Sequence, residues 1–229
     1  MPHDLIQLDA RKKIARIGFI LVIALAAVWS YYAFRWFLGN TMAEYFNTGE
    51  SNLELAKIAR TLSPNDPLTN WRVGQVAQKK LPLDQSALAL VDYEKAVSLS
   101  PNDYRFWMSL GVAREQAGET EKAELALRQA IALAPAYAYP HWYLGNLLLR
   151  QGRYDEAFSE LRTAGESDPE ELRGQLFNLL WQVYGSDIES LKRAVGTNAE
   201  TRANFVLYLL GQQKRDEGMV IWQSLDANE

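Results

Sequence analysis

Few side chains in this sequence are placed for acid–base or metal chemistry. Its 229 residues include two histidines, His3 and His141, and no cysteine. The histidines are not spaced to share a metal ion on one helix face, and no glycine-rich phosphate loop or nucleophile elbow occurs. Acidic clusters such as Glu119 with Glu121 are expected at helix N-termini and on solvated surfaces. We therefore expect no enzyme, no metal site and no cofactor.

Aromatic side chains are concentrated in one short stretch that suits binding. Tyr139, Trp142 and Tyr143 fall within five positions, and Asn146 and Arg150 follow. Large aromatic rings beside hydrogen-bonding groups can hold a peptide or a sugar chain. The same rings could instead pack on a neighbouring helix. Both interpretations stay open at this point.

The charge distribution disfavours nucleic acid as a partner. Residues 1–38 hold five basic and two acidic residues, whereas the remainder holds 19 basic and 26 acidic residues. An acidic body without a basic run binds a phosphate backbone poorly. We expect no nucleic-acid partner.

An uncharged stretch near the start predicts a membrane segment. Residues Ile17 to Phe34 carry no charge, and a helix of this length spans roughly 27 Å. Aromatic residues gather toward its C-terminal end, where a membrane interface would lie: Trp29, Tyr31, Tyr32 and Trp36. A cleaved signal peptide, with Ala24-Leu25-Ala26 as its small-residue site, is the alternative to a retained anchor.

Basic residues set the expected direction of this segment. Four lie between Arg11 and Arg16, whereas Arg35 stands alone on the other side until Lys57. The positive-inside rule makes residues 1–16 a cytoplasmic tail and residues 17–38 a single-pass anchor of the inner membrane. The C-terminal part is then outside the cytoplasm, which in a bacterium means the periplasm.

A 34-residue period organises the rest of the chain. Shifting the sequence by 34 superposes Leu110, Gly111, Gly118, Ala123, Leu127, Ala130 and Pro135 on Leu144, Gly145, Gly152, Ala157, Leu161, Ala164 and Pro169. Each unit holds two apolar-periodic segments of helical length, such as 104–117 and 120–133, joined by a turn that contains glycine. Small residues are expected where the two helices cross (Gly111, Gly145, Ala123 and Ala157), and prolines where the second helix stops (Pro135 and Pro169).

This spacing resembles the tetratricopeptide repeat (TPR). The resemblance implies an all-α fold, in which an N-terminal transmembrane helix continues into an α-solenoid of antiparallel helix pairs. Stepping back by 34 assigns residues 70–169 to three repeats and residues 39–69 to a diluted first repeat. Residues 170–229 are expected to form degenerate helical repeats. The chain ends without a polar capping helix, which leaves open whether it is part of a longer protein.

In this family the first helix of each unit lines a concave groove. Carried over residue by residue, the resemblance places in that groove Trp71, Gln75 and Gln78, then Arg105, Met108 and Glu115, then Tyr139, Trp142, Tyr143, Asn146 and Arg150. Some members clamp a carboxylate with lysines and asparagines. The corresponding positions here hold Gly74, Gln78, Ser109, Tyr139 and Tyr143, so that clamp is absent.

The resemblance implies a binding protein. We expect a membrane-anchored scaffold of the bacterial cell envelope that recruits a protein or peptide partner through the groove, with polysaccharide export or secretion machinery as its setting. Two alternatives stay open. One is a periplasmic chaperone that holds exported proteins or apo-proteins, and the other is a carbohydrate-binding module of a glycan-assembly system.

Overall fold

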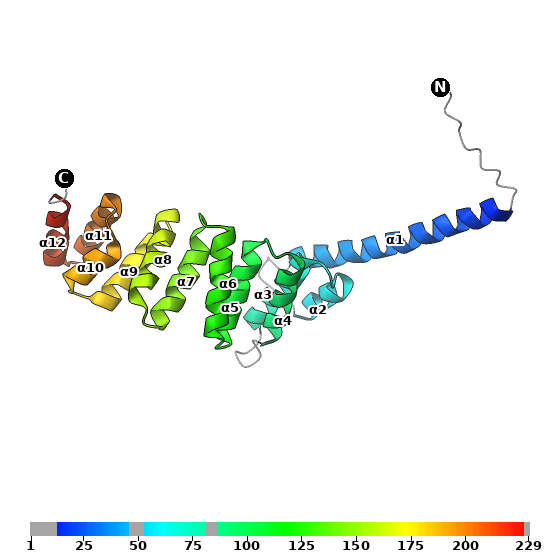
Figure 1. Ribbon diagram of the computed structural model, residues 1–229, viewed down its shortest axis with the longest axis horizontal. Helices are drawn as coiled ribbons and strands as arrows, with labels where there is room; N and C mark the ends of the chain where they lie inside the picture. Colours follow the sequence, from blue (N-terminus) through cyan, green and yellow to red (C-terminus); the bar gives the residue numbers. More distant parts are fainter. Residues whose placement is uncertain (1–12, 46–52, 81–86, 227–229) are drawn as a thin grey trace, which may run out of the picture. The chain divides into compact units, whose positions relative to one another are not determined.

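The regular secondary structure of the residues that the structure describes is entirely helical. A computed structural model describes residues 13–45, 53–80 and 87–226, which hold twelve α-helices and no strand. The helices fall in two compact units, Met1–Lys80 and Leu81–Glu229 (Figure 1). The first unit holds α1 (Lys13–Tyr45), α2 (Leu53–Leu62) and α3 (Pro67–Lys80). The second holds α4 (Ala87–Leu99), α5 (Tyr104–Gln116), α6 (Thr120–Leu133), α7 (Ala138–Arg150), α8 (Tyr154–Ser167), α9 (Arg173–Tyr184), α10 (Ile188–Val195), α11 (Ala199–Gly211) and α12 (Arg215–Asp226). The predicted all-α fold is confirmed.

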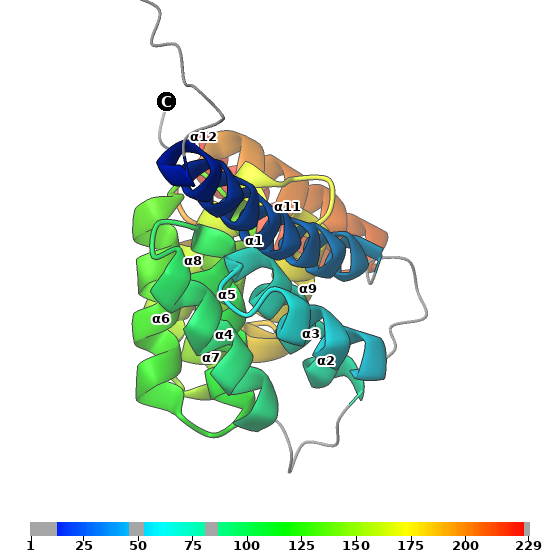
Figure 2. The same cartoon turned by 90° about the vertical axis from the view of Figure 1, so that its right-hand side faces the viewer.

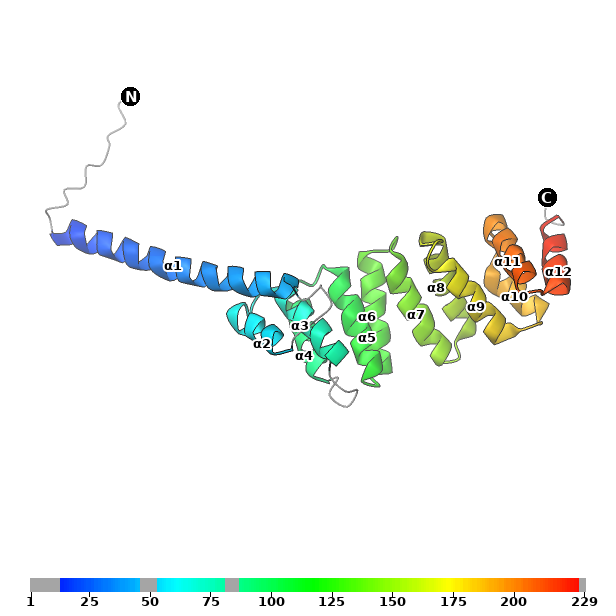
Figure 3. The same cartoon turned by 180° about the vertical axis from the view of Figure 1, so that it is seen from behind.

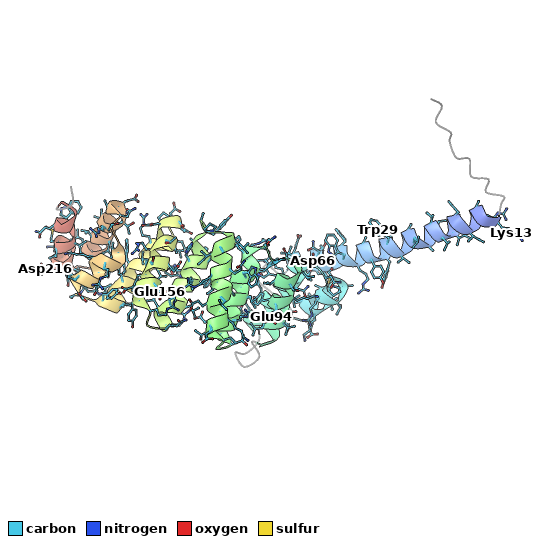
Figure 4. All side chains as sticks on the ribbon, in the orientation of Figure 1. Lys13, Trp29, Asp66, Glu94, Glu156 and Asp216 are labelled. Carbon is cyan, nitrogen blue, oxygen red and sulfur yellow. The ribbon has the colours of Figure 1, made fainter. Side chains whose placement is uncertain are left out.

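The long helix α1 has two parts with different surroundings. Its large apolar side chains from Ile17 to Phe34 are 52–75% exposed. Figure 4 shows the side chains around Trp29 projecting with no other helix of the first unit beside them. From Arg35 onward α1 packs on α2 and α3. The Arg35 guanidinium donates to the Thr61 carbonyl at 2.7 Å, so the apolar helix runs without a break into the first packed hairpin.

Helix pairs α5–α6 and α7–α8 repeat one packing arrangement. A Cβ built on Gly111 would lie 2.7 Å from Leu127 Cγ, and one built on Gly145 would lie 2.6 Å from Leu161 Cγ. Glycine is therefore the only residue that fits at this helix crossing without a movement of the facing leucine. Figure 3 shows the helix pairs α5–α6, α7–α8, α9–α10 and α11–α12 following one another in chain order, and Figure 2 looks along the same row.

Turns and caps mark the ends of these helices. Gly118 and Gly152 have φ of +78° and +75°, the left-handed conformation that closes α5 and α7. Helices α6 and α8 end at Leu133 and Ser167, two residues before Pro135 and Pro169. At the other end, the Asp103 carboxylate accepts a hydrogen bond from the Arg105 backbone N–H and caps α5.

The register predicted for the first helix of the first of the three repeats was wrong by three residues, whereas its second helix, α4, keeps the 34-residue step to α6. Helix α3 begins 37 residues before α5, whereas α5 begins 34 residues before α7. The extra residues belong to the α3–α4 link, residues 81–86, which lies outside the described residues. Gly74 therefore corresponds to Gly111, and Trp71 corresponds to Met108 and Trp142. The 37-residue spacing was visible in the Ser-Pro-Asn-Asp stretches that begin at positions 63 and 100.

The last five helices share one apolar core. Phe158 and Leu161 of α8 pack with side chains of the later helices: Leu176, Phe177, Leu180, Leu191, Ala194, Val195, Phe205, Val206, Leu209 and Ile221. This cluster holds α9 in a fixed place next to α8, although the 34-residue period fails after Pro169.

Candidate functional site

The second unit has an open groove lined by the first helices of successive pairs. Its volume is about 500 Å³. Helix α5 contributes Val112, Glu115 and Gln116, and helix α7 contributes Trp142, Tyr143, Asn146 and Arg150. Helix α9 contributes Gln175, Asn178, Leu179 and Gln182. Three helices that are separate in the sequence therefore build one surface.

Five of the residues predicted for a groove meet here: Glu115, Trp142, Tyr143, Asn146 and Arg150. Their role in binding remains a prediction. The four α9 residues were missed because the repeat period gives no register after Pro169. Their spacing was a usable signal, since Gln175, Asn178, Leu179 and Gln182 follow an i, i+3, i+4, i+7 pattern. They form a largely polar face opposite the buried residues Leu176, Phe177 and Leu180.

Three other predicted residues of the second unit do not line the groove. Arg105 is paired with Asp103, with 2.6 Å between Nη2 and Oδ2, and this hydrogen bond lowers the pKa of the Asp103 carboxyl. Met108 packs against the buried core between α6 and α7. Tyr139 lies beside Tyr143, with 6.4 Å between ring centroids. A hydrogen bond to Glu171 raises the pKa of Tyr139 to about 12.

The remaining predicted residues belong to the first unit. Trp71 is 8% exposed, and the Arg72 guanidinium lies 4.7 Å from its ring centroid. The Gln75 side-chain oxygen accepts a hydrogen bond from Arg72 at 3.1 Å. Gln78 is half-buried on the same helix, α3. Trp71 and Gln75 thus both contact Arg72 within their own unit.

Both interpretations of the aromatic stretch hold in part. Trp142 packs against Ala138, Ala164 and Leu172, and it also lines the groove. Tyr143 packs against the core between α6 and α8 and likewise lines the groove. Both side chains are thus partly held by core contacts and also border the groove. Aromatic residues fixed in this way lose little side-chain entropy when a ligand binds.

The two charged side chains of the groove balance each other. The Arg150 Nε donates to Glu115 Oε1 at 2.6 Å and connects α7 to α5. Five further lining side chains are amides: Gln116, Asn146, Gln175, Asn178 and Gln182. Some are held by the protein, since Asn146 donates to the Trp142 carbonyl and Asn178 accepts from the Tyr208 hydroxyl. Amides donate and accept hydrogen bonds, as the peptide backbone does.

Neither acid–base nor metal chemistry is evident in this arrangement. In the described part of the chain, no group of three or more His, Asp or Glu side chains is placed to hold a metal ion. The lining of the groove instead offers aromatic surface and hydrogen-bonding amides.

Two models of the tetratricopeptide repeat match the sequence, one over residues 83–138 and one over residues 116–176. Together they cover α4 to α8 and the start of α9. The chain is a tetratricopeptide repeat protein. Proteins built from these repeats mediate protein–protein interactions, and their helix pairs correspond to α5–α6 and α7–α8.

Curated relatives share only part of their length with this TPR chain. A TPR repeat-containing thioredoxin from Arabidopsis thaliana is 29% identical over 119 residues, which are 52% of the chain and 17% of the relative. A small glutamine-rich TPR-containing protein from Mycosarcoma maydis is 31% identical over 81 residues, 35% of the chain and 23% of the relative. The peroxisomal targeting signal receptor of Saccharomyces cerevisiae is 26% identical over 144 residues, 61% of the chain and 23% of the relative. The chain thus spans about a fifth of their length.

Solved TPR structures share the fold. PilF from Pseudomonas aeruginosa has a TM-score of 0.54 at 16% identity, covering 86% of this chain and 91% of PilF. MamA from Desulfovibrio magneticus has a TM-score of 0.53 at 15% identity, covering 85% and 97%. YrrB, described as a TPR protein with an unusual peptide-binding site, has a TM-score of 0.51 at 19% identity, covering 75% and 81%. At these identities the likeness concerns the fold alone.

Proposed function

We propose that this TPR protein is a membrane-anchored scaffold of the bacterial cell envelope that binds a partner protein in the groove formed by α5, α7 and α9. The observation that carries the proposal is the groove itself, in which fixed aromatic rings alternate with amide side chains and the single ion pair leaves no net charge. Such a lining fits an extended, uncharged protein segment, whose backbone the amides can bind.

The exposed half of α1 supports a membrane anchor. The helix from Ala15 to Glu44 has a mean hydropathy of 2.1 in its most apolar window and is long enough to cross a bilayer. Twelve large apolar side chains lie exposed between Ile17 and Phe34. At about 1.5–3 kcal/mol each, their exposure to water would forgo roughly 20 kcal/mol or more of burial energy. A bilayer would cover them all.

The packing of α1 favours a retained anchor over a cleaved signal peptide. Cleavage after Ala26 would leave the exposed apolar residues Val28, Trp29, Tyr31, Tyr32 and Phe34 on a free helix end. Residues from Arg35 onward would remain bound to α2 and would hold that end in place. With the basic residues Arg11 to Arg16 on the cytoplasmic side, the repeats lie in the periplasm.

By analogy with other anchored bacterial TPR proteins, we propose that the scaffold serves a polysaccharide-export or secretion machinery. A groove of this kind is selective because its aromatic rings and amides have fixed positions. Selectivity separates a scaffold from a chaperone, which would hold many unfolded segments weakly.

The proposal is tested by selecting peptides against the purified chain in nanodiscs and measuring their affinity for groove variants. Trp142→Ala removes the central ring and should weaken binding tenfold or more. Since Trp142 also packs internally, Gln182→Arg serves as a second variant, because it places a charge in the neutral groove at an exposed helical position. Leu125→Ala, at a 69% exposed position of α6 outside the groove, is the control and should bind as the parent does.

Each outcome separates one class of ligand from another. Tight binding of a few uncharged peptides supports the scaffold. Weak binding of most peptides would favour a chaperone, and binding of envelope glycans without peptides would favour a carbohydrate module. If Trp142→Ala and Gln182→Arg both fold and bind with unchanged affinity, the groove is not the binding site.

A further inference from the structure

His141 is held between two hydrogen-bond acceptors. It lies on α7, directly before Trp142, and is 8% exposed. Its Nδ1 is 2.6 Å from the Glu160 carboxylate of α8, and its Nε2 is 3.0 Å from the Pro135 carbonyl oxygen. A neutral imidazole carries a single N–H, so it can satisfy only one of these acceptors. The imidazolium form carries two and satisfies both.

In the other two repeats, the residue at the position of His141 donates one hydrogen bond to the same kind of carbonyl. Trp107 Nε1 donates to the Pro101 carbonyl at 2.7 Å, and Asn70 Nδ2 donates to the Pro64 carbonyl at 3.1 Å. In all three repeats a side chain thus donates to the carbonyl six residues earlier. Neither tryptophan nor asparagine ionises in this role. Only the third repeat uses a titratable donor.

The partner of His141 is also specific to the third repeat. In the 34-residue frame, Glu160 corresponds to Ala126, which is buried and carries no charge. The second repeat therefore pairs a tryptophan with an alanine where the third pairs a histidine with a glutamate. A buried cation is stable when an anion and a second acceptor surround it.

We propose that His141 is an imidazolium at neutral pH and acts as a proton-dependent lock that holds α7 against α8, thereby positioning Trp142 and Tyr143 in the groove. The protonation state of His141 is a property of the protein without ligand and does not depend on whether the groove binds a partner. The effect on the groove rests on the proposed function.

The direction of the pH dependence follows from the surroundings of His141. The hydrogen bond to Glu160 raises the pKa of His141 above its ordinary value of 6.5; burial opposes this, whereas the Pro135 carbonyl and the charge of Glu160 reinforce it. No ionisable side chain of α5 or α6 in the described residues contributes to the shift. Because the pKa is raised on folding, the stabilisation is complete below pH 6.5 and is lost as the pH rises through the folded-state pKa.

Nitrogen NMR of the imidazoles in the full chain, reconstituted in nanodiscs, tests the charge state directly. The chain has two histidines, and His3→Gln assigns the remaining signal to His141. We expect both nitrogens of His141 to be protonated at pH 7, and we expect Glu160→Gln to lower its pKa. A neutral imidazole at pH 7, or a pKa that Glu160→Gln leaves unchanged, would overturn the proposal.

A double variant controls for a merely structural role. His141→Trp with Glu160→Ala reproduces the residues of the second repeat, keeps the donor to the Pro135 carbonyl and removes both charges. Between pH 6 and 9 the melting temperature of the parent should fall more steeply than that of this variant. Equal slopes would contradict the lock. If the slopes differ but peptide affinity has the same pH dependence in both proteins, the lock stands and its connection to the groove fails.

Discussion

Two glycines decide how closely the paired helices of the second unit approach. Gly111 and Gly145 lie on α5 and α7, each facing a leucine of the following helix at a distance that excludes a Cβ. Glycine weakens a helix by about 1 kcal/mol relative to alanine, so its presence in two helix interiors needs a compensating cause. The close crossing supplies that cause.

Gly145→Ala should therefore destabilise the protein despite improving helix propensity. The new Cβ would lie 2.6 Å from Leu161 Cγ and 3.0 Å from the Ala157 carbonyl oxygen. Overpacking of this kind costs about 1–3 kcal/mol, which exceeds the gain of about 1 kcal/mol in propensity. Gly174→Ala is the matched control, because nothing lies within 4 Å of a Cβ there. Thermal unfolding should show a lower melting temperature for the first variant and an equal or higher one for the second; a stabilised Gly145→Ala would mean that the helices cross elsewhere.

Individual residues also show what the sequence could reveal about the groove. Glu115, Trp142, Tyr143, Asn146 and Arg150 were predictable because the repeat frame around them is intact. Arg105 and Met108 occupy groove positions in the repeat frame. However, Arg105 is paired with the Asp103 carboxylate, and Met108 packs against the core. Such local competition does not follow from a periodic pattern.

At the scale of the helix, turn chemistry shows that the repeat arrangement extends beyond the recognisable period. Helices α5 and α7 end in turns where the residues after Gly118 and Gly152 donate back to Arg114 and Leu148. The end of α11 has the same pattern, since Lys214 N donates to the Leu209 carbonyl at 2.8 Å. There the left-handed position holds Gln213, with φ of 61°.

Gln213→Gly should stabilise the chain. A non-glycine residue in the left-handed conformation loses about 1–2 kcal/mol, partly offset by the greater freedom of glycine in the unfolded state. The net expectation is a gain of up to about 1 kcal/mol in the free energy of unfolding, measured by urea denaturation. Gly152→Gln should show a loss of similar size. A loss of stability in Gln213→Gly would show that the Gln213 side chain has a role of its own.

The sequence predicted helices better than registers. Apolar periodicity and the prolines located α5 to α8 closely, because each helix there begins and ends with a strong local signal. The longer α3–α4 link broke the 34-residue step, so a fixed period placed the first helix of that repeat three residues away from its observed register. The place of α9 depends on packing against Phe158 and Leu161, which are distant in sequence. The position of α9, the third helix that lines the groove, is therefore set by tertiary contacts and not by the repeat period.

At the scale of the whole molecule, an exposed apolar helix and an open groove belong to one chain. The exposed part of α1 requires a cover, and the groove offers a neutral surface with fixed rings. Together they support a protein held at a bilayer that presents repeats to a partner.

Photo-crosslinking in intact cells, followed by separation of carbonate-washed membranes, tests this account most directly. A photoreactive amino acid at position 182 would lie in the groove, and one at position 125 would lie on an exposed part of α6 outside it. We predict a discrete adduct with one partner from position 182, recovered in the membrane fraction and diminished by Trp142→Ala. Recovery of the chain in the soluble fraction, or the same adducts from both positions, would contradict the account.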